Sequence, residues 1–134
     1  MIILKKWITR DFVKSHPNWI FVFGDNELRR GFGGQAKEMR GEPNSLGIRT
    51  KKYPSDKYYA FWTDDSYDEN IKMINSDLEL LKNYLNVSNK TIVIPADGIG
   101  SGKAKLAIYA PKTNKYLCEK IREICEGHEI KTIE

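Results

Sequence analysis

Trp19-Ile20-Phe21-Val22-Phe23 is an unbroken run of β-branched and aromatic residues, and Gly24 ends it. Such a run is typical of a strand buried on both faces, as in a parallel or mixed sheet with helices on each side. Thr91-Ile92-Val93-Ile94 has the same character and ends at Pro95. The two runs predict the central strands of an α/β sheet.

Four further segments predict strands through weaker patterns. The N-terminal stretch 1–4 is short and apolar and precedes a basic pair, an order that favours a first strand over a signal peptide. Residues 58–62 form an aromatic run that we expect nearer an edge of the sheet. The other two segments are Leu46–Thr50 and Glu129–Ile133, the last with alternating apolar and polar residues.

Two amphipathic helices are predicted between these strands. Apolar residues recur every three or four positions over 71–85 and again over 117–125, which places them on one helix face. Asp64-Asp65-Ser66 lies upstream of the first helix and predicts its N-terminus. The second helix follows Pro111 and stops at Gly127. Two shorter helices are expected, over residues 11–14 and 34–40.

Strands and helices alternate along the chain, and no repeat or linker divides it. We therefore expect a single domain over residues 1–134. The order of the elements predicts a three-layer α/β/α sandwich with a mixed, largely parallel sheet.

The composition is that of a globular domain, with 40% apolar and 30% charged residues. No apolar run approaches the ~20 residues that span a bilayer, and we expect a cytoplasmic protein. The net charge of +4 fits an anionic ligand, whereas the scattered lysines make nucleic-acid binding unlikely. Cys118 and Cys125 are expected to be free core residues, because seven helical positions separate them too widely for a disulfide.

Both central strands run into glycine-rich segments, which cover residues 24–36 and 95–104. Ligands of open α/β sheets bind beyond the carboxyl ends of the strands. Glycine also lets main-chain N–H groups converge on an anion at close range. The two segments therefore predict a site for a phosphorylated ligand between them.

Named motifs do not account for these segments. Three residues rather than four separate Gly98 from Gly102-Lys103, and Ala104 stands where a Walker A loop requires Ser or Thr. We do not assign either segment to the dinucleotide-binding fingerprint. No Ser-His-Asp or Cys-His pair supports covalent catalysis, and we expect neither a cofactor nor a metal ion.

Polar side chains beside the glycines are candidates for binding and catalysis. Asp25 and Asn26 follow the first strand, where a carboxylate or amide can bond ribose hydroxyls, and Asp97 follows the second, where it can orient a water. Turn-forming roles stay open for these residues. The candidate catalytic residues are Asp25, Asn26 and Asp97. The candidate ligand-binding residues are Gly24, Asn26, Gly33, Gly34, Gln35, Gly98, Ile99, Gly100, Ser101, Gly102 and Lys103.

Phe21-Val22-Phe23-Gly24-Asp25-Asn26, the segment 31–36 and the loop 97–102 together resemble a divergent macro domain, of the kind in small macro-like proteins of bacteria and phages. The resemblance covers about residues 19–110. It implies an ADP-ribose-type ligand with its diphosphate between the two loops and Asn26 at the distal ribose. Asp11 lies near the place of the family's adenine-binding Asp, without the local pattern that accompanies it.

We thus expect a domain that binds an ADP-ribose-like nucleotide derivative and, if it is an enzyme, hydrolyses an ADP-ribosyl linkage. One alternative is a non-catalytic module that sequesters a nucleotide signal. Another is a small RNA- or protein-interaction domain that uses Lys51, Lys52, Lys103 and Lys105. Lys51 and Lys52 are expected to matter less than Lys103 for phosphate binding, because neither lies on a glycine loop.

Overall fold

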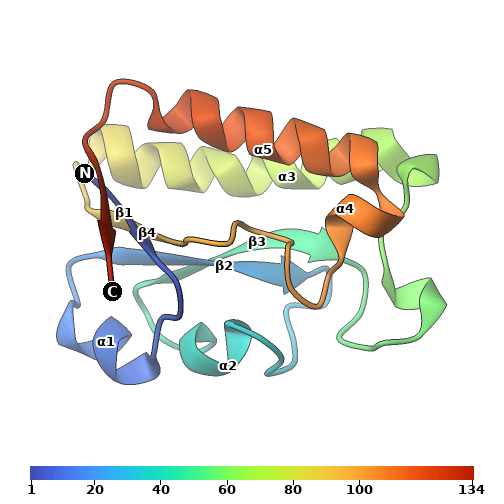
Figure 1. Cartoon of the computed structure of the whole chain (residues 1–134), viewed down its shortest axis with the longest axis horizontal. Coiled ribbons are helices and arrows are strands. Elements are labelled where there is room, and N and C mark those ends of the chain that lie inside the picture. The colour runs from blue at the N-terminus through green and yellow to red at the C-terminus, as the bar shows by residue number, and fades with distance from the viewer.

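The computed structural model describes all of residues 1–134 and shows strands alternating with helices (Figure 1). The strands are β1 (Ile2–Lys5), β2 (Ile20–Asn26), β3 (Ser45–Lys51), β4 (Ile92–Pro95) and β5 (Ile130–Ile133). The α-helices are α1 (Arg10–Ser15), α2 (Ala36–Met39), α3 (Tyr67–Lys82), α4 (Leu106–Tyr109) and α5 (Pro111–Cys125). Shorter helical turns are the 3-10 helices Tyr58–Ala60 and Asp64–Ser66 and the π-helical turn Asn83–Val87.

The five strands form one sheet in the order β3-β2-β4-β1-β5, and every neighbouring pair is parallel. The expected α/β class is confirmed, and the expectation of a mixed sheet is wrong. Each of the first four strands is followed by a helical connection that returns the chain to the same end of the sheet, so all strands run in one direction.

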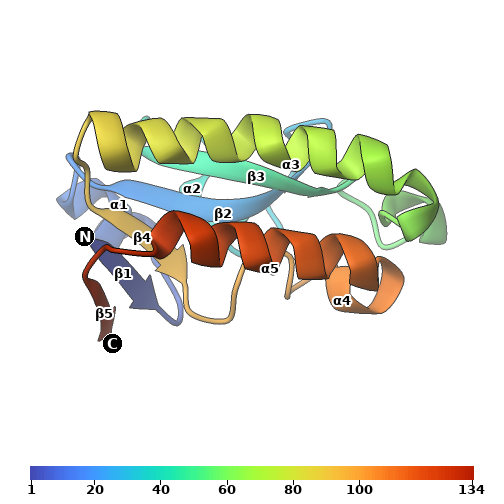
Figure 2. The same cartoon turned by 90° about the horizontal axis from the view of Figure 1, so that it is seen from above.

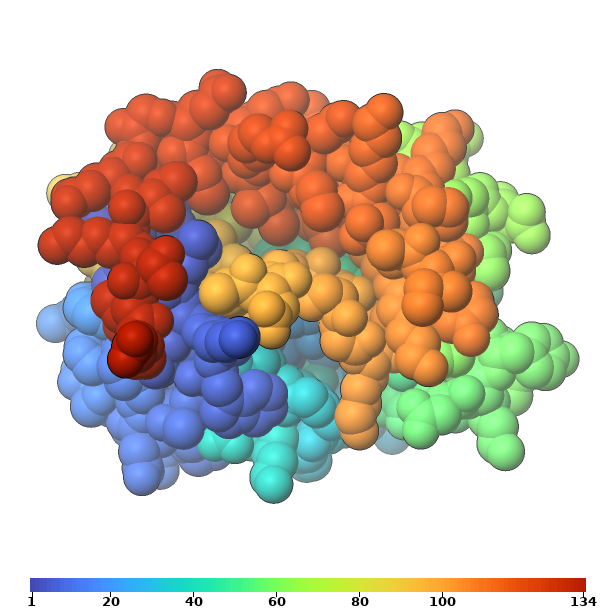
Figure 3. All heavy atoms as spheres, in the orientation of Figure 1, coloured from blue at the N-terminus to red at the C-terminus, as the bar shows by residue number.

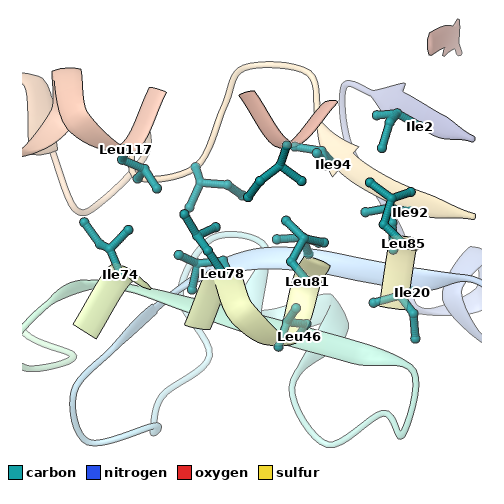
Figure 4. Close-up of a cluster of buried hydrophobic side chains, with 14 of the residues drawn as sticks. Ile2, Ile20, Leu46, Ile74, Leu78, Leu81, Leu85, Ile92, Ile94 and Leu117 are labelled. Carbon is teal, nitrogen blue, oxygen red and sulfur yellow. The ribbon is translucent and has the colours of Figure 1, made fainter. Parts of the chain in front are cut away.

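Helices cover both faces of this sheet. Figure 1 shows α3 and α5 over one face and α1 and α2 against the other, and Figure 2 shows α3 and α5 lying side by side. Alternate residues of β2 enter different cores, because Ile20 and Val22 pack under α3 and α5 whereas Phe21 and Phe23 face α1 and α2. Figure 4 shows the larger core, with Leu78 of α3 among its members. Burial on both faces is what the unbroken apolar runs predicted.

The two long helices follow the apolar stripes of the sequence. Ile74, Leu78 and Leu81 are buried on α3, and Leu117 and Ile124 are buried on α5. None of the helices combines the length and the apolar character that crossing a membrane requires.

The two cysteines are free, as expected, but they are not both core residues. Cys118 is exposed, and only Cys125 is partly buried against the larger core. Burial raises the pKa of the Cys125 thiol.

The segment 58–62 does not form the strand expected of it. Tyr58–Ala60 is a 3-10 turn, and Phe61 makes a single antiparallel bridge to Lys51. Further along the outer edge of β3 the Arg49 N–H donates to the carboxylate of Asp77 on α3 at 2.8 Å, so at that residue the edge is not open to another strand.

Asp64 caps a different helix from the one that the sequence suggested. Its carboxylate accepts hydrogen bonds from the N–H groups of Lys112 and Thr113, both at 2.9 Å, and from the Thr113 hydroxyl at 2.8 Å. These groups lie in the first turn of α5, whereas α3 has no side-chain cap. Partial burial opposes ionisation, but these hydrogen bonds and the Lys112 charge outweigh it and lower the pKa of Asp64.

Replacing Asp64 with alanine is expected to lower the free energy of unfolding at pH 7 by about 1 kcal/mol, the usual contribution of a helix cap. Because the pKa of Asp64 is lowered in the fold, the ionised carboxylate stabilises the protein above its ordinary pKa of 3.8. That contribution is lost as the pH falls through the lower value of the folded state. Urea unfolding at pH 7 and in acid should show that the difference in the free energy of unfolding between wild type and variant becomes smaller as the pH falls. Asp65→Ala is the matched control, because Asp65 is exposed, and an equal loss in that variant would rule out a specific cap.

Candidate functional site

The connections between strands change direction at the centre of the sheet. The chain passes from β2 through α2 to β3 on one side, and from β4 through α5 to β5 on the other. Because β2 and β4 are neighbours, a crevice opens between the loops that leave their carboxyl ends. A cleft of about 530 Å³ lies there. Figure 3 shows it as a hollow between the N-terminal segment, the segment 31–40 and the loop after β4.

The cleft has a polar lining, with only 3 hydrophobic residues among its 24. This composition suits a charged or highly polar ligand better than an apolar one. Every predicted site residue except Ile99 lines the cleft. The Ile99 side chain is 4% exposed and packs in the larger core, so only its main chain is available to a ligand.

Loop 1 (residues 27–35) is shaped by side chains that sequence analysis had assigned to a ligand. The Asn26 amide accepts from Leu28 N–H at 3.1 Å and donates to the Arg30 carbonyl at 2.6 Å. The Gln35 amide accepts from Ile8 N–H and donates to the Ile8 carbonyl, both at 2.8 Å. Asn26 and Gln35 therefore fix the two ends of loop 1.

Asp25 is a buried carboxylate held by two arginines. Its Oδ1 accepts from the Asn26 N–H at 2.8 Å and from Arg40 Nη2 at 2.5 Å. Its Oδ2 accepts from Arg29 Nη1 at 3.2 Å and Arg40 Nη1 at 3.4 Å. The side chain is 2% exposed. Because these four donors occupy the carboxylate's lone pairs, the geometry does not favour water activation by Asp25.

The arginines extend this network to α3. Arg29 also bonds Asp77 at 2.8 Å, and Arg49 bonds the other oxygen of Asp77 at 3.0 Å. Arg40 in turn donates from Nε to the Gly31 carbonyl at 2.7 Å. Loop 1 is thus tied to β2, β3 and α3 by ion pairs and hydrogen bonds.

Loop 2 (residues 96–105) is held differently. Gly98 and Gly100 have φ of +94° and +84°, a region that glycine adopts without strain. No main-chain N–H from Ile99 to Ala104 donates to another backbone group. The same is true of the N–H groups from Gly31 to Ala36 in and after loop 1. Two runs of free main-chain donors therefore lie on segments that line one cleft.

Loop 2 lies close to the end of β2 and to loop 1 where glycines permit it. A Cβ on Gly24 would lie 3.4 Å from the Gly100 nitrogen. A Cβ on Gly33 would lie 3.2 Å from Cδ of Lys103. Gly33 does not have a positive φ, so its role here is to leave room for the lysine rather than to permit an unusual backbone.

Loop 1 has the spacing of the dinucleotide-binding fingerprint in Gly31-x-Gly33-x-x-Ala36, but not its context. The fingerprint opens a long helix directly after a strand. Here Gly31 comes five residues after the end of β2, and α2 has only four residues. A helix of this length has only a small dipole, so attraction of an anion at this place would depend on the N–H groups of the loop.

Residues from β1 and β3 complete the cleft, and sequence analysis did not assign them to it. Lys6 and Trp7 follow β1, and Thr50 and Lys51 end β3. The signal was available, because the carboxyl ends of parallel strands meet at one edge of the sheet. Phe32 of loop 1 also lines the cleft and is 65% exposed.

Lys51 is the least expected of these residues. It is 8% exposed, forms no ion pair, and places Nζ 4.8 Å from the centroid of the Phe61 ring. Burial lowers its pKa, Asp56 opposes that effect, and the charges of Lys103 and Lys105 lower it further. The reason for ranking Lys51 below Lys103 was its position outside the glycine loops, yet both lysines line the same cleft.

The acidic residues are placed very differently from one another. Asp97 is exposed, lines the cleft and takes no part in the ion pairs that hold Asp25. Asp11 lies in the first turn of α1, exposed and outside the cleft. No group of three or more His, Cys, Asp or Glu side chains is arranged to hold a metal ion.

Comparison with known proteins identifies the family of the chain without a functional description. Searches of curated proteins and of solved structures found no significant match. No macro-domain family matches either. One family model matches residues 3–120, a range that contains every residue lining the cleft. The chain therefore belongs to that family, which is described as the Family of unknown function (DUF7831).

Proposed function

We propose that the cleft binds an ADP-ribose-like phosphorylated nucleotide derivative, with its diphosphate between loop 1 and loop 2. The two runs of free main-chain N–H groups, 31–36 and 99–104, carry this proposal. Unpaired main-chain donors are satisfied by water or by an anion, and a glycine-rich concave backbone favours the anion. Lys51 and Lys103 add positive charge to the same cleft.

The remaining groups of the cleft suit the nucleoside part of such a ligand. Trp7 and Phe32 line the cleft and are 49% and 65% exposed, so an aromatic base can stack on either ring. The resemblance of loop 1 and loop 2 to those of macro domains supports ADP-ribose over other nucleotides.

Hydrolysis of an ADP-ribosyl linkage is the reaction that we propose if the ligand is turned over. Asp25 is occupied by Arg29 and Arg40, so Asp97 takes the role of the carboxylate that orients the water. Asp97→Asn should then abolish turnover and leave ADP-ribose affinity nearly unchanged. A parent protein that binds without turnover would instead be the sequestering module.

The test of binding is a comparison of ADP-ribose with AMP and ribose 5-phosphate by calorimetry and thermal unfolding. A ligand at a hundred times its Kd stabilises the fold by about 2.7 kcal/mol. We expect ADP-ribose to bind at least tenfold more tightly than either fragment, because only ADP-ribose carries a diphosphate for both loops. Equal affinities would contradict a diphosphate site. No binding of any of the three, with salt-dependent binding of RNA, would favour the interaction domain.

A further inference from the structure

We propose, on the basis of the function proposed above, that Lys51 and Lys103 form a pyrophosphate subsite on the β3 side of the cleft, with the charge of Lys105 close by. In this subsite the entering diphosphate provides the counter-ion that the Lys51 ammonium lacks. Lys51 is then the residue that makes the site prefer a ligand group with two negative charges.

The backbone holds Lys51 in place from both sides. Its carbonyl accepts from the Glu27 N–H at 2.9 Å, and the following Lys52 N–H donates to the Ala60 carbonyl at 2.9 Å. A bulge in the pairing of β2 with β3 aligns Asn26 with Lys51 rather than with Thr50. Lys51 therefore ends β3 directly beside the start of loop 1.

The Lys51 ammonium faces the cleft without a salt-bridge partner. Lysine is almost never buried unless it is paired, yet the Lys51 residue is 8% exposed and takes part in no salt bridge, and its Nζ is left in contact only with the solvent of the cleft and with an aromatic ring. That ring belongs to Phe61, which itself stacks on Tyr109 with 4.4 Å between the ring centroids. A ring face attracts a cation far less strongly than a desolvated phosphate does.

The charges around Lys51 set the class of ligand. Asp56 attracts it, whereas Lys103 and Lys105 repel it. Four cationic side chains line the cleft, Lys6, Arg30, Lys51 and Lys103, together with two exposed carboxylates, Asp56 and Asp97. Asp25 also lines the cleft, but Arg29 and Arg40 neutralise it. The lining therefore has an excess of about two positive charges. A pyrophosphate diester carries two negative charges and matches that excess.

Binding at this subsite has a measurable consequence for protons. Burial, with the two neighbouring lysines, lowers the pKa of Lys51 in the free protein, and a bound diphosphate raises it again. At a pH between the free and bound values, the ligand binds together with a proton. Below both values the amine is already charged, and above both it stays neutral, so proton uptake passes through a maximum as the pH rises.

The experiment is calorimetry of ADP-ribose and of UDP-glucose from pH 6 to pH 10, in pairs of buffers that differ in ionisation enthalpy. Both ligands are pyrophosphate diesters that do not themselves gain or lose diphosphate protons in this range. We expect net proton uptake that depends on pH and passes through a maximum. Lys51→Met should remove the uptake and weaken binding at least tenfold, without lowering the urea midpoint of unfolding. Lys52→Met is the matched control, because Lys52 does not line the cleft. This variant should keep both the proton uptake and the affinity of the wild type.

The outcomes separate the two proposals. Tight binding of ADP-ribose without proton uptake, or with uptake that persists in Lys51→Met, would overturn the Lys51 subsite and leave the proposed function standing. Binding of UDP-glucose with Lys51-dependent uptake, but not of ADP-ribose, would support the subsite and overturn the ADP-ribose assignment. Failure of both ligands to bind would overturn both.

Discussion

Replacing Asp25 with alanine is expected to lower the free energy of unfolding by about 3–5 kcal/mol, the cost of removing one partner from a buried ion pair. The Asp25 carboxylate accepts from Arg29, Arg40 and the Asn26 N–H at a site that is 2% exposed. Without it, the Arg40 guanidinium is left partly buried with only carbonyl partners. Urea unfolding followed by circular dichroism measures the loss.

Two further variants make this result specific to the network. Asp97→Ala should leave stability within about 0.5 kcal/mol of wild type, because Asp97 is exposed. Gly47→Ala should destabilise the fold by an independent route, since a Cβ there would lie 2.6 Å from Oδ2 of Asp25. If Asp25→Ala unfolds like wild type but loses turnover, then Asp25 is the catalytic carboxylate after all.

Replacing Gly98 with valine is expected to weaken ADP-ribose binding at least tenfold. Gly98 has φ of +94°, where a β-branched residue is strained by roughly 1–3 kcal/mol. A Cβ there has no heavy atom within 4 Å, so loop 2 is free to relieve the strain by changing shape. The unpaired N–H groups from Ile99 to Ala104 would then be displaced. Calorimetry with ADP-ribose measures the loss.

Gly127→Val is the matched control for this variant. Gly127 also has a positive φ, +79°, with open space around it, but it follows α5 and does not line the cleft. Both variants should lose a similar amount of stability, and only Gly98→Val should lose affinity. An affinity that is unchanged in Gly98→Val would remove loop 2 from the binding site.

The features predicted well from the sequence are those that depend on local pattern. Ile20–Phe23 and Ile92–Ile94 have unbroken apolar runs because helices cover both faces of the sheet. The glycines after these strands indicated which segments line the cleft, since few other residues are compatible with such turns.

The features that were missed depend on partners distant in sequence. No sequence pattern near Asp25 indicates that Arg40, fifteen residues later, donates a hydrogen bond to its carboxylate. Lys51 was expected to matter less than Lys103 because it does not lie on a glycine loop. Its burial arises from the bulge opposite Asn26 and from the turn that brings Phe61 over it. Asp64 similarly caps a helix that begins 47 residues later.

Ion pairs hold loop 1 but not loop 2, so the two sides of the cleft differ in rigidity. To move loop 1, a ligand would have to break the ion pairs of Arg29 with Asp25 and Asp77. Loop 2 has no such ion pairs, and its hydrogen bonds from Gly98 to Lys105 join only residues of the loop and its flanks. Its buried side chain is Ile99, which packs in the larger core, so the part of the loop that is free to move on a ligand is 101–105. The rate of ligand release would follow the mobility of this part of the backbone, and stiffening it would lengthen the life of the complex more than it speeds capture.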